Sequence, residues 1–525
     1  MNILFVLYGD FGSNSANPLV LYARELSQRG HCCAIAVPSS LETVSLHAHI
    51  AFRPFLYADV LANPSSVFSD GRPADVIHAC TPREVVRRFT TLYMAKQPTP
   101  LVLYLEDHEQ WISARTLGLD EEMLIRHTEQ EISEMTPLFL AHPFYSDSFI
   151  GMADAVAVIQ DKLKAFVPSW VYCKTVMIGV DLDFFYPRPP DPILRKRYGL
   201  MESEKVLVYH GVVHDFTRPG IRNLCEAVGI INQKGFQCRL LRTGPYPLEF
   251  PVKLSSQCTP FISDLGLLPK PALPGLLALA DVCVQPGGKN PFEDLRLPGK
   301  IPEWLAMGRP VVMPDTNIAH LFQDGENAIF LQKGSPEEIA EKCINLFCHP
   351  QMANEMGRAG RTFAENFFDV RRQAAVLEEV YLTACKKFSP SISAVVWQAQ
   401  ADDYSPVLRL ASKLNLIGSA RGTNDYDCGE LMQEYGKLLD DRCQRLKALE
   451  SRLSESLRGK GIIKSLIAKI FTFPLRVFSM FLQKVFGLGE SDDWLRIEFE
   501  KGIKIFRCEG WVGLRFRLKR KLRNR

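Results

Sequence analysis

A lysine and a glutamate three positions apart are the residues whose spacing most directly suggests chemistry. Lys300 and Glu303 stand where the pattern predicts a short helix over 302–307, with Pro298 before it and Gly308 at its end. This spacing places both side chains on one side of the first turn. A helix start attracts anions, the lysine adds a cation for phosphate, and the glutamate accepts hydrogen bonds from sugar hydroxyls. The pair suits a nucleotide sugar, and a surface salt bridge is the alternative explanation.

Strands and helices alternate along the chain and would position these residues. Residues 2–8 form a short apolar run, and a loop with Gly9 and Gly12 follows. A glycine-bearing turn after the first strand is where doubly wound folds bind ligands. The pattern predicts helices over 18–30, 221–234 and 274–280, a long periodic segment over 336–385, and further strands over 31–37, 76–78, 101–105, 155–159, 175–178, 206–210, 237–243, 281–285 and 311–313.

Two rounds of this alternation predict two domains. The run from Gly179 to Pro187 stands between the rounds and has the composition of a linker. We therefore expect an α/β fold with two Rossmann-like domains that face a cleft. The expected boundaries are 1–182 and 183–390 for these domains, 391–437 for a loosely ordered linker, and 438–525 for a helical, basic, amphipathic tail.

Composition and charge narrow the class of protein. The net charge of +3 is uneven, because residues 458–525 carry 17 Lys/Arg against 6 Asp/Glu and the remainder carries 45 against 53. A basic tail on an acidic body indicates an anionic surface contacted by the tail. The fourteen cysteines form no C-x-x-C pair, which favours reduced thiols in a cytosol. Residues 1–8 resemble a buried strand more than a signal peptide, and no run is long enough to predict a spanning helix.

Four segments resemble the motifs of one enzyme family, the retaining GT-B glycosyltransferases of glycosyltransferase family 4. Gly179-Val-Asp-Leu-Asp-Phe-Phe-Tyr-Pro resembles the interdomain signature, and Leu276–Pro286 resembles a strand motif. Lys300–Val312 resembles the donor helix, and Asp324–Ala328 resembles a turn motif. Each segment alone is weak evidence for the family, but the four together, in this order and spacing, are specific. The resemblance covers about three quarters of the chain, to about residue 385.

The resemblance implies a nucleotide-diphosphate-sugar donor held mainly by the second domain and an acceptor held by the first. Glu303 matches the family glutamate that binds the donor ribose, and Lys300 would lie close to the diphosphate or the sugar. Gly244 matches the turn beside the nucleotide, and Gly12 matches the glycine loop near the donor phosphates. No metal and no cofactor are implied, because side chains and helix dipoles stabilise the leaving diphosphate.

The chain also departs from the family pattern. The family's first glutamate, eight positions before Glu303, would fall at Leu295, and the neighbours Glu293, Asp294 and Arg296 are candidate substitutes. The usual basic pair after the first strand of the second domain is missing, so Arg218 is the best candidate for the phosphate cation, with His214 behind it. These departures motivate a second hypothesis, a degenerate GT-B protein that acts as a membrane-associated sugar-binding scaffold.

Polar residues after the strand 101–105 are the candidate catalytic residues. Glu106 and Asp107 follow the strand directly, at the end that faces the expected cleft. Acceptor binding and stabilisation of an oxocarbenium-like transition state is one interpretation, with Asp107 favoured. A solvated loop that caps the next helix is the other, and it has comparable weight.

For Gly9 and Gly12, the alternative to ligand binding is a tight turn that needs positive φ. The chain lacks a G-x-G-x-x-G fingerprint, which argues against a dehydrogenase.

The tail carries two distinct patterns. Leucines over 439–457 recur at coiled-coil spacing, which suits self-association or packing against the body equally well. Residues 462–525 interleave bulky apolar residues with lysines and arginines, the pattern of a segment that lies on anionic lipid. A solvated basic tail is the alternative, and nucleic acid is disfavoured because the body is acidic.

The leading hypothesis is therefore a retaining, metal-independent glycosyltransferase on the cytoplasmic face of a membrane. It would add a sugar to a glycan or lipid-linked acceptor during polysaccharide or lipopolysaccharide assembly. A GT-B epimerase is disfavoured, because such an enzyme needs no acceptor and has no use for a lipid-directed tail.

Overall fold

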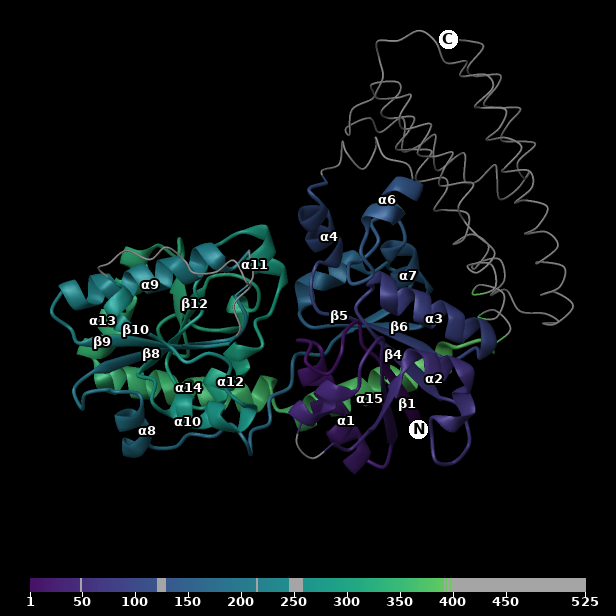
Figure 1. Cartoon of the computed structure of the whole chain (residues 1–525), viewed down its shortest axis with the longest axis horizontal. Helices are drawn as coiled ribbons and strands as arrows, with labels where there is room; N and C mark the ends of the chain where they lie inside the picture. Colours follow the sequence, from purple (N-terminus) through teal and green to yellow (C-terminus); the bar gives the residue numbers. More distant parts are fainter. Residues whose placement is uncertain are drawn as a thin grey trace, which may run out of the picture. The chain divides into compact units, whose positions relative to one another are not determined.

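The computed structural model describes residues 1–390 except 48–49, 120–128, 214–215 and 245–257, together with Ser393 and Trp397. Of the described residues, 1–113 and 138–388 fall in the larger of two units, and 114–119 and 129–137 fall in the other. The larger unit contains two parallel sheets (Figure 1). The linker expected over 391–437 lies outside the described residues apart from Ser393 and Trp397, and the tail 438–525 lies wholly outside them.

The first sheet has seven parallel strands in the order β3-β2-β1-β4-β5-β6-β7. β1 lies between β2 and β4, so the strand order reverses beside it, and its register pairs Asn2 with Cys32 and Ile3 with Val76. Every residue of β1, β4 and β5 is buried, as expected for central strands covered on both faces. The strands are β1 (Asn2–Val6), β2 (Cys32–Val37), β3 (Arg53–Leu56), β4 (Val76–Cys80), β5 (Leu101–Leu105), β6 (Ala155–Val158) and β7 (Tyr172–Thr175).

Helices from both ends of the described chain cover this sheet. α1 packs against α15, and α15 also contacts β4, β5 and β6. The buried His78 of β4 shares a 2.8 Å hydrogen bond with the Tyr381 hydroxyl of α15. The helices of this part of the chain are α1 (Ala16–Gln28), α2 (Tyr57–Ala62), α3 (Glu84–Lys96), α4 (Glu109–Leu117), α6 (Glu129–Met135), α7 (Ser146–Met152) and α15 (Val370–Lys387).

The second sheet has six parallel strands in the order β10-β9-β8-β11-β12-β13. β8 is its central strand beside the reversal, and its register with β9 pairs Tyr209 with Arg242 and His210 with Thr243. The strands are β8 (Lys205–His210), β9 (Cys238–Thr243), β10 (Ile262–Asp264), β11 (Val282–Val284), β12 (Val311–Pro314) and β13 (Ile329–Leu331).

Helices lie on both faces of the second sheet. α9 packs against α13 on one face, and α12 packs against α14 on the other (Figure 1). The helices are α8 (Pro192–Arg197), α9 (Arg218–Gln233), α10 (Leu273–Ala278), α11 (Pro291–Leu295), α12 (Lys300–Ala306), α13 (Pro336–Cys348) and α14 (Pro350–Phe367). None of the helices in the described ranges has the length and apolar content to cross a membrane.

The structure confirms the α/β class and the two parallel sheets, and it corrects several elements. The strand predicted over 175–178 is wrong except for Thr175, because β7 ends there and the apolar residues that follow leave the sheet. The Val176 carbonyl accepts a 2.9 Å hydrogen bond from the Tyr104 side chain instead of from a neighbouring strand. Val176 is therefore buried by packing and does not extend β7. The long pattern over 336–385 divides into α13, α14 and α15, with Pro350 and the capping Asp369 at the two breaks. The domain boundaries and the cleft stay predictions.

Gly179 lets two segments that are distant in sequence approach closely. A Cβ on Gly179 would lie 2.8 Å from Cα of Val370, in the first turn of α15. Beside it, Val180 donates to the Phe368 carbonyl at 2.7 Å and accepts from Val370 at 3.2 Å. Residue 179 is therefore glycine because a side chain would collide with backbone that cannot move aside.

We predict that Gly179→Ala destabilises the protein by about 1 to 3 kcal/mol, because the new methyl group overlaps the backbone of α15. Urea unfolding measures the difference. Gly151→Ala in α7 is the matched control, because its nearest neighbour is an ordinary 3.6 Å contact with Trp170. Equal stabilities of the two variants would contradict the close approach.

Candidate functional site

Lys300 and Glu303 lie at the start of α12, against the end of β8. Ile301, Trp304 and Leu305 of the same helix are completely buried, and this burial fixes the helix on the sheet. The Glu303 side chain is 22% exposed, so it is neither in a solid interior nor free in solvent. The predicted pair therefore has the expected helical placement, but the helix begins at Lys300 rather than at residue 302.

Lys300 and Glu303 each have a partner on β8 rather than each other. Lys300 Nζ donates to the Tyr209 hydroxyl at 3.0 Å and lies 4.3 Å from the centre of that ring. Glu303 Oε2 lies 2.6 Å from Nε2 of His210. No Lys300–Glu303 ion pair is found within the described residues, so the surface salt bridge does not explain this spacing.

Two glycines open the space above these strand ends. Gly244 follows β9 with φ at +125°, and a Cβ there would collide with the backbone of Gly211. Gly211 follows β8 with φ at +126°, and a Cβ there would lie 3.0 Å from Cε of Lys300. The prediction of Gly244 as a backbone position beside a ligand is consistent with this geometry, and Gly211 is an addition that sequence reasoning missed.

Arg218 is the first residue of α9, the helix that follows β8. The helix start packs closely on the sheet, because a Cβ on Gly220 would lie 3.3 Å from the Gly287 nitrogen and the Pro286 carbonyl. Arg218 is half-buried at this helix start. It therefore lies beyond the carboxyl end of β8, the strand end that Lys300 and Glu303 also contact. His214, the second candidate for the phosphate cation, lies outside the described residues.

Glu106 and Asp107 follow β5 at the carboxyl end of the first sheet, as predicted. Glu106 accepts hydrogen bonds from the Ser15 hydroxyl and, at 3.4 Å, from the Cys80 thiol. Burial raises the pKa of Glu106, and these two hydrogen bonds oppose the rise. Burial also raises the pKa of Asp107 to about 7, the nearby Glu109 adds to the rise, and Arg296 opposes it. A carboxyl that titrates near neutral pH can exchange a proton with a ligand hydroxyl.

Glu109 and Arg83 form the buried ion pair beside these carboxyls. Arg83 donates to Glu109 at 3.0 Å, and its guanidinium lies 3.7 Å from the centre of the Tyr8 ring. The Glu109 side chain is only 2% exposed, so its charge is balanced locally by Arg83. Glu109 therefore has a structural role, and the carboxyl ends of β1, β4 and β5 meet at one acidic cluster.

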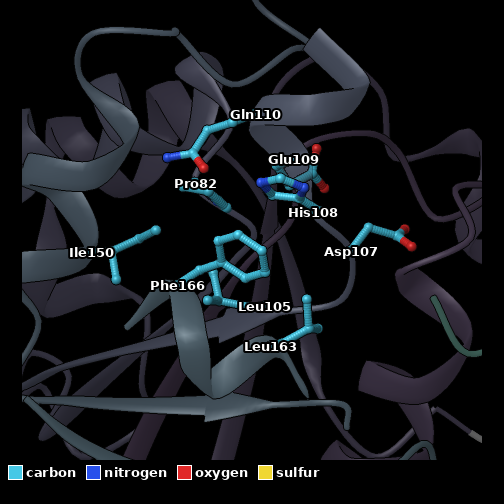
Figure 2. Close-up of a pocket in the computed structure, with 9 residues that line it drawn as sticks. All are labelled: Pro82, Leu105, Asp107, His108, Glu109, Gln110, Ile150, Leu163 and Phe166. Carbon is cyan, nitrogen blue, oxygen red and sulfur yellow. The ribbon is translucent and has the colours of Figure 1, made fainter. Parts of the chain in front are cut away.

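A pocket of mainly apolar side chains adjoins Asp107 (Figure 2). Leu105, Ile150 and Leu163 form apolar walls, and the His108 ring stacks on Phe166 with ring centres 4.0 Å apart. Figure 2 shows Asp107 at the edge of this pocket, apart from the apolar side chains. The cavity has room for about one water molecule, so Asp107 lies beside a small apolar recess rather than a ligand-sized pocket.

Gly12 lies in the exposed loop between β1 and α1, and its nitrogen donates to Asp10 at 3.0 Å. Neither Gly9 nor Gly12 has positive φ, so a need for positive φ explains neither glycine. Gly12 nevertheless lies in a turn, which the Ser13 N–H closes on the Asp10 carbonyl at 3.1 Å. The same loop carries Ser15, which reaches Glu106. The loop therefore borders the acidic cluster, although no contact joins Gly12 itself to the predicted donor residues.

The three neighbours of Leu295 have different environments. Asp294 forms an ion pair with Lys162, which lies between β6 and β7 of the first sheet. The Asp294 carbonyl also accepts a 3.0 Å hydrogen bond from the side chain of Gln160. Glu293 is buried beside Gly287, and its Oε2 lies 3.6 Å from Arg296. Arg296 in turn acts on Asp107 through its charge. The segment around Leu295 thus links the two halves of the larger unit, with Arg296 nearest to the acidic cluster.

Sequence reasoning missed the partners that hold the predicted residues. Tyr209, His210 and Ser15 contact Lys300, Glu303 and Glu106, respectively. Each of these contacts joins residues 91 or more positions apart, beyond the reach of local patterns. The only feature of the sequence that could have indicated these three partners is their position at or just beyond the carboxyl end of a predicted strand.

Comparison with known proteins agrees with this geometry. Residues 204–349 match the model of the family "Glycosyl transferases group 1". A Bacillus subtilis (strain 168) protein that carries the name glycosyltransferase EpsD is 26% identical over 37% of this chain and 50% of its own length. The GDP-mannose-dependent alpha-(1-6)-phosphatidylinositol dimannoside mannosyltransferase of Mycobacterium tuberculosis is 28% identical over 39% of this chain and 50% of its own length. The matched region thus spans about half the length of these curated relatives.

Solved structures show the same fold. Anabaena HepE in complex with UDP and glucose superposes with a TM-score of 0.55 at 16% identity, over 72% of this chain and 98% of HepE. Sucrose-phosphate synthase of Thermosynechococcus elongatus gives 0.52 at 14% identity, over 73% and 98%. The chain therefore has the GT-B fold of two Rossmann-like domains. Its residues 204–349, which carry Arg218, Gly244, Lys300 and Glu303, are the part that matches the glycosyl transferases group 1 model.

We predict that Asp107→Asn stabilises the protein at pH 8 but not near pH 4. The folded-state pKa of about 7 exceeds the ordinary value of 3.8, so the folded protein binds more protons between these values and its stability falls as pH rises. Asparagine removes this loss, a gain on the order of 2 kcal/mol above pH 7. Urea unfolding across the pH range measures it. The exposed Asp59→Asn controls for the loss of one carboxylate, and a pH-independent difference at Asp107 would contradict the assignment.

Proposed function

We propose that this protein is a glycosyltransferase that moves a sugar from a nucleotide-diphosphate-sugar donor to a glycan or lipid-linked acceptor. The observation that carries the proposal is the donor-type site of the second sheet: Lys300 and Glu303 on one helical turn, above Gly211 and Gly244, within the group 1 region. The names of the relatives support the substrate classes, because one depends on GDP-mannose and acts on a phosphatidylinositol dimannoside, and HepE is in complex with UDP and glucose.

The donor side can bind a nucleotide sugar through complementary charges. Glu303 would accept hydrogen bonds from the ribose hydroxyls, and its carboxylate is exposed enough to be reached. Lys300, Arg218 and the starts of α9 and α12 would face the diphosphate. The close backbone at Gly211 and Gly244 would let the nucleotide approach the strand ends without a side chain between. Stabilisation of the leaving diphosphate by these fixed groups is the main catalytic effect that we propose.

The acceptor side would use the acidic cluster of the first sheet. Asp107, with its pKa near 7, would hydrogen-bond the attacking hydroxyl, and Glu106 would stabilise positive charge at the anomeric carbon. No side chain is proposed as a covalent nucleophile. We propose a front-face reaction with retention, assisted by the leaving phosphate and independent of metal ions.

The scaffold hypothesis stays as the second candidate, because Leu295 occupies the position where a carboxylate is expected. The decisive experiment incubates the purified full-length protein with UDP-glucose and GDP-mannose and measures release of UDP or GDP, with and without glycan and lipid-linked acceptors. Release in the presence of EDTA and an unchanged anomeric configuration in the product would support each part of the proposal. Binding of a nucleotide sugar without release under every condition would favour the scaffold.

We predict that Glu303→Ala lowers kcat/KM roughly 100-fold while the protein stays folded, because a hydrogen bond to a charged group is lost. Steady-state kinetics and circular dichroism measure the two effects. Glu341→Ala, at an exposed position of α13, is the matched control and should keep full activity. Wild-type turnover by Glu303→Ala would remove this residue from the site.

We also propose that the protein is cytoplasmic and binds the inner face of a membrane through residues 462–525, with self-association through 439–457 as a further proposal. We predict that the full-length protein sediments with vesicles of anionic phospholipid and that a chain ending at Lys460 does not, because it lacks the basic apolar segments. Neutral phosphatidylcholine vesicles are the control. Equal sedimentation of both chains would contradict the assignment to the tail.

A further inference from the structure

Three consecutive residues at the end of β8 contact both predicted donor-binding side chains. The Tyr209 hydroxyl accepts a hydrogen bond from Lys300, His210 contacts Glu303, and Gly211 leaves room for the Lys300 side chain. The residues that the sequence predicts to bind a ligand lie on α12. The side chains that contact them lie on the neighbouring strand β8. This arrangement suggests that the strand end has a role beyond forming the sheet.

His210 lies between a buried donor and an accessible acceptor. Its Nδ1 accepts a 3.0 Å hydrogen bond from Nε1 of Trp304, and its Nε2 lies 2.6 Å from Oε2 of Glu303. Trp304 is completely buried, His210 is 7% exposed, and the Glu303 side chain is 22% exposed. The three side chains thus form a hydrogen-bonded row from the protein interior to the surface that a ligand can reach.

The chemistry of this row determines the tautomer of His210. The indole N–H of tryptophan can only donate, so Nδ1 of His210 must act as the acceptor and carries no proton. The ring proton is therefore on Nε2, where it points at a carboxylate that can only accept. An imidazole with the opposite tautomer would place two N–H groups against each other at Trp304 and leave Glu303 without a donor.

We propose that His210 is a positioning residue for Glu303. Trp304 fixes the imidazole as the Nε2–H tautomer, and this N–H holds one carboxylate oxygen of Glu303 so that the other faces the ligand. Pre-orientation of a charged acceptor lowers the entropy lost when a hydroxyl binds it. The identity of the ligand hydroxyls as those of a ribose rests on the proposed function, whereas the hydrogen-bonded row does not.

Two substitutions separate the two hydrogen bonds of His210. In His210→Gln the amide nitrogen can replace Nε2 and donate to Glu303, but the acceptor for Trp304 is lost. In His210→Asn the amide oxygen can replace Nδ1 and accept from Trp304, but the donor to Glu303 is lost. A purely structural role predicts that stability and ligand affinity fall together. Positioning predicts opposite orders: His210→Gln loses stability and keeps affinity, and His210→Asn keeps stability and loses affinity.

The first measurement needs no ligand. Long-range ¹H–¹⁵N spectra of the full-length protein labelled at histidine nitrogens report which ring nitrogen carries the proton, and the His210→Gln spectrum identifies the signals. We expect a protonated Nε2 in the wild type and a shift of that signal in Glu303→Gln. A protonated Nδ1, or a His210 signal that Glu303→Gln leaves unchanged, would overturn the proposal whatever the protein binds.

The second measurement uses UDP and GDP, each compared with its 2′,3′-dideoxy form, in titrations of the wild type and both His210 variants. We expect His210→Asn to weaken binding of the ribonucleotide that binds the wild type by about tenfold and to leave the dideoxy form unaffected. Tighter or unchanged binding to His210→Asn would overturn the positioning role. If neither nucleotide binds the wild type, the proposed function fails, and the spectra alone decide the role of His210.

Discussion

The close packing of α12 between β8 and α14 is the constraint on which the proposed donor side of this protein depends. Trp304 and Leu305 are completely buried, and a Cβ on Gly360 of α14 would lie 2.9 Å from Leu305. Arg309, just after the helix, donates to the carbonyls of Ala280 and Arg188 at 3.1 and 2.8 Å. Because the buried face of α12 is fixed by this packing, Lys300 and Glu303 in its first turn are held beside the end of β8. Small residues at Gly211 and Gly244 then keep that space open.

The two sheets place opposite chemistry at their carboxyl ends. The first gathers carboxyls, and burial holds the pKa of Asp107 near 7 while Arg83 compensates the charge of Glu109. The second carries Lys300 and Glu303 at the start of α12 and Arg218 at the start of α9, both beside the end of β8. This division fits a reaction in which one partner gives up a proton and the other leaves as an anion. Arg296, near Leu295, is the residue of the second half whose charge reaches Asp107.

Local patterns predicted the architecture and the helix with Lys300 and Glu303, because spacing along one helix needs no knowledge of its neighbours. They also placed Glu106 and Asp107 at a strand end, where parallel topology brings functional residues together. The patterns missed β3, β10 and β13, which are short edge strands of three or four residues. They could not supply His210 or Ser15 as partners, because those contacts arise only when β8 meets α12 and the first loop meets β5.

The return of α15 to the first sheet means that the polypeptide passes between its two halves twice. The chain crosses to the second sheet near Val180 and returns at residues 368–370. The two crossings lie side by side and are joined by backbone hydrogen bonds of 2.7 and 3.2 Å. Because the two crossings are hydrogen-bonded to each other, neither can shift alone without breaking these bonds. α15 also makes the first sheet dependent on a distant part of the chain, because a protein cut after residue 367 would lack the helix that packs on β4, β5 and β6.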